Sequence, residues 1–457
     1  MPEGFKNLIS KLYRLFELKT WFSDVIFSRV FKNAGFLLSG KTVTGLLGLG
    51  YLSLAAHGLG LEEFGLLILI QTYVQVVIGL TTFHSWQAVI KYGSNSINSN
   101  DIRGFQRLIS FTTLLDLTGV IIGTTLAWVL APILGPFLGW GHEAIYYAKV
   151  YSFLILFTVV ATPTGILRLY DRFDLLAWQV IITPALRLFG VIIAVFVDAP
   201  IWAYLIIWFI ASIVGGFTLV FLGWKEGKRQ GVLVNMNWSV TGVRKQHKGI
   251  IGFCFASNFN SSLQLVTGHL STIIVGFIAN PATAGLFKVA REVATAITKP
   301  AELLTQSIYP EFAKLGTVKK WSEFSFLLWR SALTAGLSSI IILFFMVFLG
   351  KDFLNIFFGI EFQQAYSVLL LLVISACITI VGFSFDPALY AMGLPGLALR
   401  VNAFVVILVY LPMLVLFTKF IGLVGPGIAL LSSTIITFIS LGFLVNRKLR
   451  HKISKID

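Results

Sequence analysis

Charge is scarce in this sequence. Asp, Glu, Lys and Arg together make up only 12% of the 457 residues, whereas hydrophobic residues make up 57%. Water-soluble domains contain about 25% charged residues, so the composition excludes an ordinary soluble fold and predicts an integral membrane protein. The net charge of +15 does not indicate nucleic-acid binding, because the basic residues stand in short segments between apolar runs.

Cysteine is nearly missing as well. Cys254 and Cys377 both lie inside apolar runs, where cysteine serves as a small buried apolar residue. Two such residues exclude a disulfide framework and a four-cysteine metal site. The sequence shows neither a nucleophile–histidine–acid arrangement nor a nucleotide-binding glycine loop, and its loops are too short for a soluble catalytic domain. We therefore expect a protein that is not an enzyme and needs no cofactor or metal.

Long apolar runs are what the sequence has in abundance. A spanning helix needs about 20 mostly apolar residues, and twelve runs qualify: 34–56, 62–84, 108–131, 147–167, 176–197, 200–223, 250–279, 282–307, 325–349, 365–386, 398–418 and 422–445. Lys and Arg concentrate in the N-terminal segment, in loops that follow even-numbered spans and in the C-terminal tail. The loops after odd-numbered spans hold only Lys351 and Lys419. The positive-inside rule therefore predicts cytoplasmic termini and a multi-pass protein of the inner (plasma) membrane.

The spans divide into two halves around the longest basic loop. Residues 33–223 hold spans one to six, residues 224–249 form a basic cytoplasmic linker, and residues 250–445 hold spans seven to twelve. Residues 1–32 lack the apolar core of a signal peptide and have the pattern of a basic amphipathic helix lying on the membrane. Residues 446–457 form a basic cytoplasmic tail.

Short matches at a constant spacing indicate an internal repeat. Gly65 in "LGLEEFGLLILI" matches Gly285 in "ANPATAGLFKVA", and Tyr170 in "LRLYDRF" matches Tyr390 in "PALYAMG", in both cases 220 positions further on. Transporter folds often consist of two such copies. Two copies of six spans each have the same orientation, so the halves are predicted to be related about an axis along the membrane normal.

The same motifs resemble those of a known family. "LGLEEFGLLIL" and "TIIVGFIANPATAGLFKVA" resemble outer turns of polysaccharide-biosynthesis membrane proteins, and "SIYPEFAKL" resembles the segment after their eighth span. The whole chain resembles the Wzx-type flippases of lipid-linked oligosaccharides, whose superfamily includes MATE drug exporters and lipid II flippases. The resemblance implies two six-helix lobes in a V around a central cavity. It also implies an undecaprenyl-pyrophosphate-linked oligosaccharide substrate, such as an O-antigen unit of lipopolysaccharide. Ser271 departs from the pattern, because many relatives carry an acid there.

One predicted span carries a row of charge. At 100° per residue, seven polar residues share an arc of about 100°: Lys288, Arg291, Glu292, Thr295, Lys299, Glu302 and Gln306. The row from Lys288 to Glu302 extends about 21 Å along the helix axis. A basic residue at mid-membrane costs about 2.5–3.5 kcal/mol, so the row is predicted to face protein or a wet cavity rather than lipid.

Five embedded cations form the predicted substrate-binding set: Lys41, Arg187, Lys288, Arg291 and Lys299. Lysine and arginine in a low-dielectric site suit a pyrophosphate. Four carboxylates are candidates for ion coupling or for pairing with these cations: Asp116, Glu292, Glu302 and Asp386. Pairing is the alternative explanation of the row, because Lys288 and Glu292 are four residues apart and Lys299 and Glu302 three.

The function predicted from these features is alternating-access translocation of a lipid-linked oligosaccharide for cell-surface polysaccharide assembly. Pro300 interrupts the backbone hydrogen bonding of span eight and is a candidate hinge, whereas His269 is expected to be structural. Expected partners are the substrate, membrane lipids and a polymerase or chain-length complex. The main alternative is a MATE-like exporter of small molecules coupled to H+ or Na+, for which Asp116 is the candidate carboxylate. A membrane polymerase and a non-transporting scaffold are further alternatives.

Overall fold

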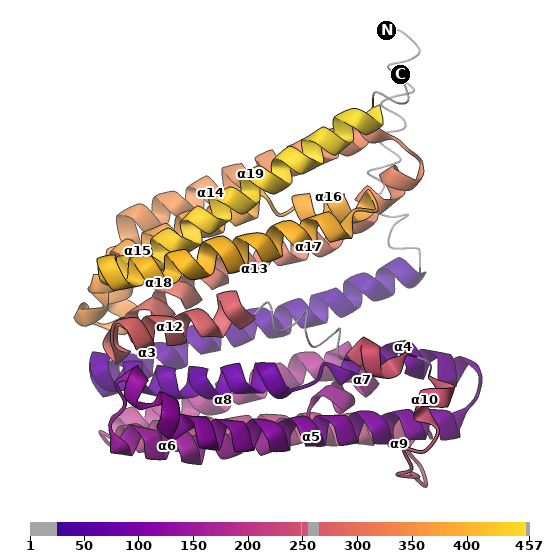
Figure 1. Ribbon diagram of the computed structural model, residues 1–457, viewed down its shortest axis with the longest axis horizontal. Helices are drawn as coiled ribbons and strands as arrows, with labels where there is room; N and C mark the ends of the chain where they lie inside the picture. Colours follow the sequence, from indigo (N-terminus) through magenta and orange to yellow (C-terminus); the bar gives the residue numbers. More distant parts are fainter. Residues whose placement is uncertain (1–24, 248, 255–264, 454–457) are drawn as a thin grey trace.

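The computed structural model describes residues 25–247, 249–254 and 265–453, and their regular elements are all helical. The first lobe, drawn from indigo to magenta in Figure 1, contains α3 (Val25–Thr81), α4 (Ser85–Asn98), α5 (Ile102–Leu134), η1 (Pro136–Leu138), α6 (His142–Ser152), η2 (Phe153–Phe157), α7 (Ala161–Leu169), α8 (Phe173–Phe196), α9 (Ile201–Arg229) and α10 (Val243–Gln246). The second lobe, in orange and yellow tones, contains η3 (Val266–Leu270), α12 (Ser271–Ile278), α13 (Pro281–Thr317), α14 (Trp321–Phe358), η4 (Ile360–Ala365), α15 (Tyr366–Val381), α16 (Phe385–Ala391), α17 (Pro395–Phe404), η5 (Val405–Tyr410), α18 (Leu411–Ile421), η6 (Gly422–Val424) and α19 (Gly425–Ile453).

Eight long apolar segments of the described chain account for ten of twelve crossings. Two of these segments bend sharply and supply two crossings each: Ser39–Asn98 at Gly60 and Gly396–Ile453 at Gly422. Both glycines have φ of +69°, a conformation that is favourable for glycine and strained for other residues. The remaining two crossings are α13 and the span that ends in the short apolar helix Gly268–Ile278. α13 is not one of the eight apolar segments because it carries the row of charged residues. The prediction of about twelve spanning helices in an all-α membrane protein is therefore confirmed.

Side-chain caps fix where two of the helices begin, and at α5 the cap carries the helix beyond the predicted span. α5 begins six residues before the predicted span, where the Asp101 side chain accepts a hydrogen bond from the Gly104 amide at 2.8 Å. α13 begins in the same way, with Asn280 accepting from the Thr283 amide at 2.8 Å. Such caps satisfy amides that have no partner within the helix. Most of the predicted amphipathic segment 1–32 lies outside the described residues.

The two lobes form a V that is closed at one end. There the turn between the two crossings of α3 meets the second lobe: the Leu61 amide donates to Glu361 at 3.2 Å, and the rings of Phe64 and Phe362 pack edge to face 5.6 Å apart. Figure 1 shows the lobes diverging toward the opposite end, where α3 begins and α19 ends. The V-shaped pair of lobes implied by the family resemblance is confirmed.

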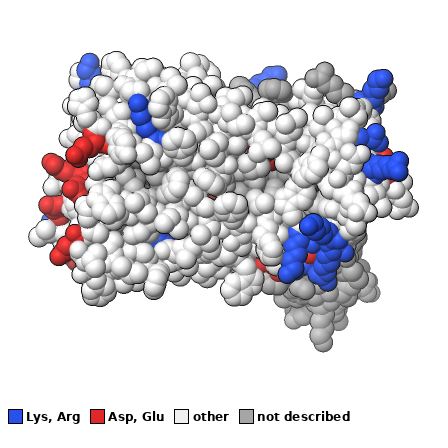
Figure 2. Space-filling model, turned by 90° about the horizontal axis from the view of Figure 1, so that it is seen from below, with Lys and Arg blue, Asp and Glu red and all other residues white. Residues whose placement is uncertain are grey.

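Charge of opposite sign gathers at the two ends of the molecule. On the face shown in Figure 2, acidic residues cluster at one end of the long axis and Lys and Arg cluster at the other. The exposed carboxylates of the turns at the closed end are Glu62, Glu63, Glu143, Asp198, Asp352 and Glu361. Between the ends the surface is apolar; α14, for example, exposes Ile340, Phe344 and Phe348. Such a belt is expected of helices that contact lipid.

Candidate functional site

A polar cavity of about 220 Å³ lies between the lobes, and we call it the central cavity. The first lobe contributes both crossings of α3, and the second lobe contributes η3 and α13. Its lining residues are Thr44, Gly45, Gly48, Leu49, Tyr51, Leu52, Gln71, Thr72, Gln75, His269, Lys288, Glu292, Ala296 and Lys299. Amides, hydroxyls and charged groups thus face one another across the boundary between the lobes, at a depth where a lipid-facing surface would be apolar.

The charged row of α13 divides according to helix geometry. Lys288, Glu292 and Lys299 line the central cavity, whereas Val289 and Val293, which point to other sides of the helix, are buried among apolar residues. Lys288, Glu292 and Lys299 therefore face a polar cavity, as the cost of exposing charge to lipid requires.

The sequence left two explanations of the row, ion pairing within the helix and lining of a cavity. Both apply to Lys288. Its ammonium lies 2.7 Å from a Glu292 carboxylate oxygen, and both side chains border the central cavity. Lys299 forms no ion pair with another described residue, and its ammonium lies 3.2 Å from where a Cβ on Gly45 would stand. The glycine thus provides the space through which Lys299 reaches toward the first lobe.

Arg291 is positioned differently from its neighbours in the row and is not among the residues lining the central cavity. Its guanidinium donates to the Gly268 carbonyl and, at 2.6 Å, to the Ser271 hydroxyl. Gly268 lies in the π-helical turn η3, which leads into α12. Arg291 therefore ties α13 to an irregular turn of span seven and to Ser271 at the start of α12.

Glu302 and Lys41 form a looser contact across the lobes. Their charged atoms are 3.9 Å apart, and each side chain is more than half exposed, so the pair contributes at most about 1 kcal/mol. Glu302 also lines a cavity of about 270 Å³ inside the second lobe, together with Asp386. The Asn402 amide donates to one Asp386 oxygen at 3.5 Å, and the other oxygen has no partner among the described residues.

Asp116 lies away from these cavities and is fully buried in the first lobe. One carboxylate oxygen accepts from the Ser85 hydroxyl at 2.7 Å, and the other accepts from the Thr162 amide and hydroxyl at 2.9 and 2.8 Å. Ser85 and Thr162 stand at the beginnings of α4 and α7. Asp116 thus fastens two helix starts in the first lobe, which is a structural use of a buried carboxylate.

Arg187 and Pro300 complete the predicted set. Arg187 lies within the first lobe on a second polar cavity, whose wall shares Thr44, Tyr51 and Gln75 with the central cavity. Pro300 lies inside α13, which continues without a break from Pro281 to Thr317. Its role as a hinge remains a prediction.

Sequence reasoning missed several residues of the central cavity. Gln71 and Gln75 line it from the second crossing of α3, and His269, expected to be structural, lines it from η3. The two glutamines are four residues apart in an otherwise apolar run, which places them on one face of a helix. Polar residues at that spacing inside a span are the signal that would have found them. Among the described residues, no three His, Cys, Asp or Glu side chains gather as metal ligands would.

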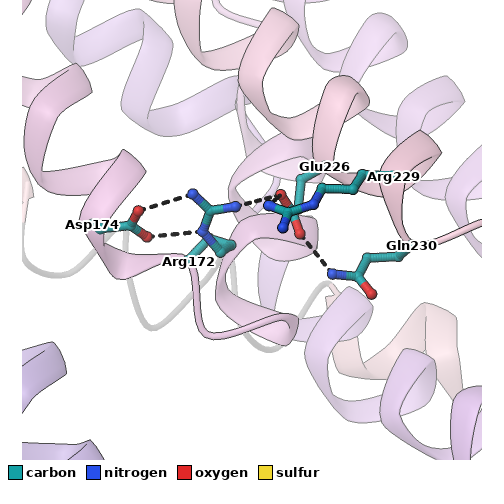
Figure 3. A network of polar contacts seen from close by, with 5 residues as sticks. All are labelled: Arg172, Asp174, Glu226, Arg229 and Gln230. Carbon is teal, nitrogen blue, oxygen red and sulfur yellow. Dashed lines mark hydrogen bonds and ion pairs between the residues drawn. The ribbon is translucent and has the colours of Figure 1, made fainter.

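An ionic network joins the ends of α8 and α9 on the side of the open end (Figure 3). The Arg172 guanidinium donates two hydrogen bonds to Asp174, at 3.0 and 2.9 Å, and a third to Glu226 at 2.6 Å. Glu226 also accepts from Gln230 at 2.7 Å. The hydrogen bonds from Arg172 lower the pKa of the Asp174 carboxyl, and those to Asp174 raise the pKa of Arg172. The bidentate geometry makes this a firm connection between two helices of the first lobe.

Comparison with known proteins adds a family and a fold. The family model described as "Polysaccharide biosynthesis protein" matches residues 30–316. The chain is 32% identical over 356 residues to "Inner membrane protein YghQ" of Escherichia coli (strain K12), an alignment that covers 78% of this chain and 99% of that protein. The structure is similar to the inward closed lipid II flippase MurJ, with a TM-score of 0.67, 16% identity and coverage of 89% and 86% of the two chains.

A MATE-family multidrug transporter of the MOP superfamily in an inward-facing conformation is similar at a TM-score of 0.65, with 14% identity and coverage of 91% of this chain and 94% of that one. At such identities these likenesses concern the fold alone. They match the V of two helical lobes described above.

Proposed function

Because this chain belongs to the polysaccharide biosynthesis protein family, we propose that it is a flippase for a polyisoprenyl-pyrophosphate-linked oligosaccharide. Its place is the inner membrane, with both termini in the cytoplasm, and its product feeds cell-surface polysaccharide assembly. The orientation is supported by the basic residues gathered at the open end and the carboxylates at the closed end (Figure 2), as the positive-inside rule expects.

The observation that carries this proposal is the polar central cavity between the lobes, with Lys288 and Lys299 on its wall. A pyrophosphate carries charge that hydrocarbon excludes, and two lysines in a site of low dielectric constant attract it more strongly than they would in water. Gln71, Gln75 and Thr72 add the donors and acceptors that sugar hydroxyls require. The polyisoprenyl tail stays in the bilayer throughout.

Glu292 is the counter-ion of Lys288 in the central cavity. In the absence of substrate it neutralises Lys288 at 2.7 Å, which removes much of the cost of an embedded cation. An entering phosphate offers Lys288 a stronger partner, and Glu292 then remains as a negative group that favours later release. We infer that Lys288 exchanges partners during each transport cycle.

The V of two lobes supports a mechanism of alternating access. The contacts of Phe64 and Leu61 with the second lobe close one end, and the lobes diverge at the other, so the cavity receives the head group from the cytoplasmic side. Rocking of the lobes about the cavity then exposes it on the opposite side. Pro300 in α13 is the proposed hinge.

Reconstituted transport tests the role of the cavity. Purified protein in liposomes is given a fluorescent polyisoprenyl-pyrophosphate-linked oligosaccharide, and the rate of flipping is followed by quenching of the outer leaflet. Lys288→Glu should lower the rate about 10–100-fold, because it replaces an attraction for phosphate by repulsion. Lys351→Glu makes the same charge change at an exposed site of the closed end and should flip at the rate of the wild type. Normal flipping by folded Lys288→Glu protein would exclude the cavity as the route.

Deletion of the gene provides the corresponding cellular test. Lipid-linked oligosaccharide should accumulate on the cytoplasmic leaflet, and surface polymer should disappear. Accumulation of a small-molecule drug with unchanged surface polymer would instead identify an exporter. The buried environment of Asp116 and its hydrogen bonds to Ser85 and Thr162 favour a structural role and so support the flippase over that alternative.

A further inference from the structure

A second polar cavity, of about 390 Å³, lies within the first lobe between α3, α8 and α9. We call it the Arg187 pocket. Amide and hydroxyl side chains supply most of its polar wall: Thr44, Gln75, Thr158, Gln179, Thr183 and Ser212. Pro184 helps to build it, because proline cannot bond the carbonyl four residues earlier, and the released Val180 carbonyl accepts from Thr44 at 3.2 Å.

Among the described residues, Arg187 is the one charged residue that lines this pocket, and only 6% of it is exposed. Its terminal nitrogens donate to the Tyr51 hydroxyl at 3.3 Å and to the Ser212 hydroxyl at 2.9 Å. Its Nε is buried and has no partner among the described residues. The Tyr51 and Trp208 rings pack edge to face, and the guanidinium lies beside this pair, 5.5 and 5.0 Å from the two ring centroids.

No carboxylate in the described part of the chain pairs with this charge. None of the ion pairs among the described residues includes Arg187, whereas Lys288 and Arg172 each have an acidic partner. A buried cation without a counter-ion is costly, and two aromatic faces offset part of the cost. A buried guanidinium that lines a cavity and has no ion-pair partner among the described residues is therefore prepared for an anion that arrives from outside.

The other lining groups indicate what carries the anion. Amides and hydroxyls that both donate and accept, beside the aromatic Tyr51, form the kind of surface that binds the hydroxyls and apolar faces of a sugar. The pocket and the central cavity share Thr44, Tyr51 and Gln75 as wall residues. A head group held at Lys288 can therefore extend one of its sugars past Tyr51 to Arg187.

We propose that the Arg187 pocket binds a sugar bearing a carboxylate or a phosphate, and so selects oligosaccharides that carry an acidic unit. Arg187 forms a charge-assisted fork to the acidic group, while Gln179, Thr183 and Ser212 bond the hydroxyls of the ring. The assignment of this sugar to the transported head group rests on the proposed function; the presence of an anion-binding sugar pocket does not.

The test uses soluble sugars and purified full-length protein in detergent. D-glucuronate, glucose 6-phosphate and D-glucose are titrated at matched ionic strength, and the ligand-induced rise in Tm is followed by tryptophan fluorescence. At least one charged sugar should bind about tenfold more tightly than glucose. A larger effect of glucuronate identifies a carboxylate as the acidic group, and a larger effect of glucose 6-phosphate identifies a phosphate.

Three variants assign the effect to Arg187. Arg187→Gln should abolish the preference for charged sugars, Arg187→Lys should retain part of it because the charge remains, and Arg330→Gln should retain all of it. Arg330 is exposed on α14, far from the pocket in sequence and outside its wall. Equal binding of charged and neutral sugars by the wild type would overturn the proposal. So would a preference that survives in folded Arg187→Gln protein, and Arg187→Lys provides the comparison should the glutamine variant fail to fold.

The transport assay separates this inference from the proposed function. If the wild-type protein prefers charged sugars but does not flip a lipid-linked oligosaccharide, the flippase function is wrong and the assignment of the Arg187 pocket is retained. If it flips such a lipid but shows no preference for charged sugars, the assignment of the Arg187 pocket is wrong and the flippase function is retained.

Discussion

Gly65 and Gly285 pack backbone against backbone where the two lobes meet. A Cβ placed on Gly285 would lie 3.0 Å from the Gly65 Cα, closer than side-chain carbons normally approach. The two residues stand 220 positions apart, the spacing of the internal repeat. Equivalent positions of two halves can touch each other directly when they lie near the axis that relates the halves. This glycine pair therefore marks that axis at the closed end of the V.

The closed end should fail when a side chain is forced into this contact. Gly65→Ala would direct a methyl group at the Pro281 backbone, and such overpacking costs about 1–3 kcal/mol. We expect a lower Tm and easier opening of the closed end. Thermal unfolding measures the first effect, and labelling of a cysteine placed at Leu61 measures the second. Gly396→Ala, at a helical glycine with open space around it, should leave both unchanged; an equal loss in both variants would contradict the contact.

The Lys288–Glu292 pair should be visible as coupling between two substitutions. Either Lys288→Gln or Glu292→Gln leaves the other charge without its 2.7 Å partner, and each should lower the free energy of unfolding by about 1–2 kcal/mol, because the pair borders a wet cavity rather than dry protein. The double variant should be less destabilised than the sum of the single ones. Additive effects in unfolding titrations would show that the pair contributes nothing to the empty protein.

Asp116 should behave as a structural carboxylate. In Asp116→Asn one oxygen acceptor becomes an amide donor that faces the Thr162 amide and hydroxyl, and the unmatched donors cost about 1–3 kcal/mol. We expect a lower Tm and a normal flipping rate per folded molecule. A stable Asn variant that no longer transports would instead assign Asp116 to ion coupling.

The network at the open end predicts a pH dependence of stability. Arg172 lowers the pKa of the Asp174 carboxyl from its ordinary value of 3.8. A lowered folded-state pKa contributes stability at pH values above 3.8, and this contribution is lost as the pH falls through the folded-state value. Below about pH 4, therefore, the Tm of the wild type should fall more steeply than that of Asp174→Asn. Asp352→Asn, at an exposed carboxylate outside the described ion pairs, should follow the wild type, and parallel curves for all three proteins would refute the linkage.

Much of the fold could be predicted because hydrophobic length and period are local properties. The twelve spans and the repeat that pairs Gly65 with Gly285 follow from the order of residues alone. The helical period likewise places Lys288, Glu292 and Lys299 on one face of α13, and this face lines the central cavity. Helix ends were less predictable, because the Asp101 cap extends α5 six residues before its predicted span.

The candidate site was predicted less completely. Arg291 belongs to the same row by angle, yet it bonds the Gly268 carbonyl in an irregular turn of a different span. Arg187 was grouped with the α13 cations, but it occupies a pocket of its own. Gln71 and Gln75 were not predicted as site residues. Two amides in an apolar run indicate a cavity only when a second helix is known to face them.

The sequence by itself determined that this chain crosses the membrane twelve times as helices and that one of these helices carries a row of charge. It could do so because a bilayer requires apolar length and a helix repeats every 3.6 residues. Only the tertiary structure decided which cations face the central cavity, which one lines a second pocket in the first lobe and which carboxylate is enclosed by hydroxyl and amide donors. Helix period fixes the direction in which a side chain points, whereas the packing of distant segments decides whether it meets protein, a cavity or a counter-ion.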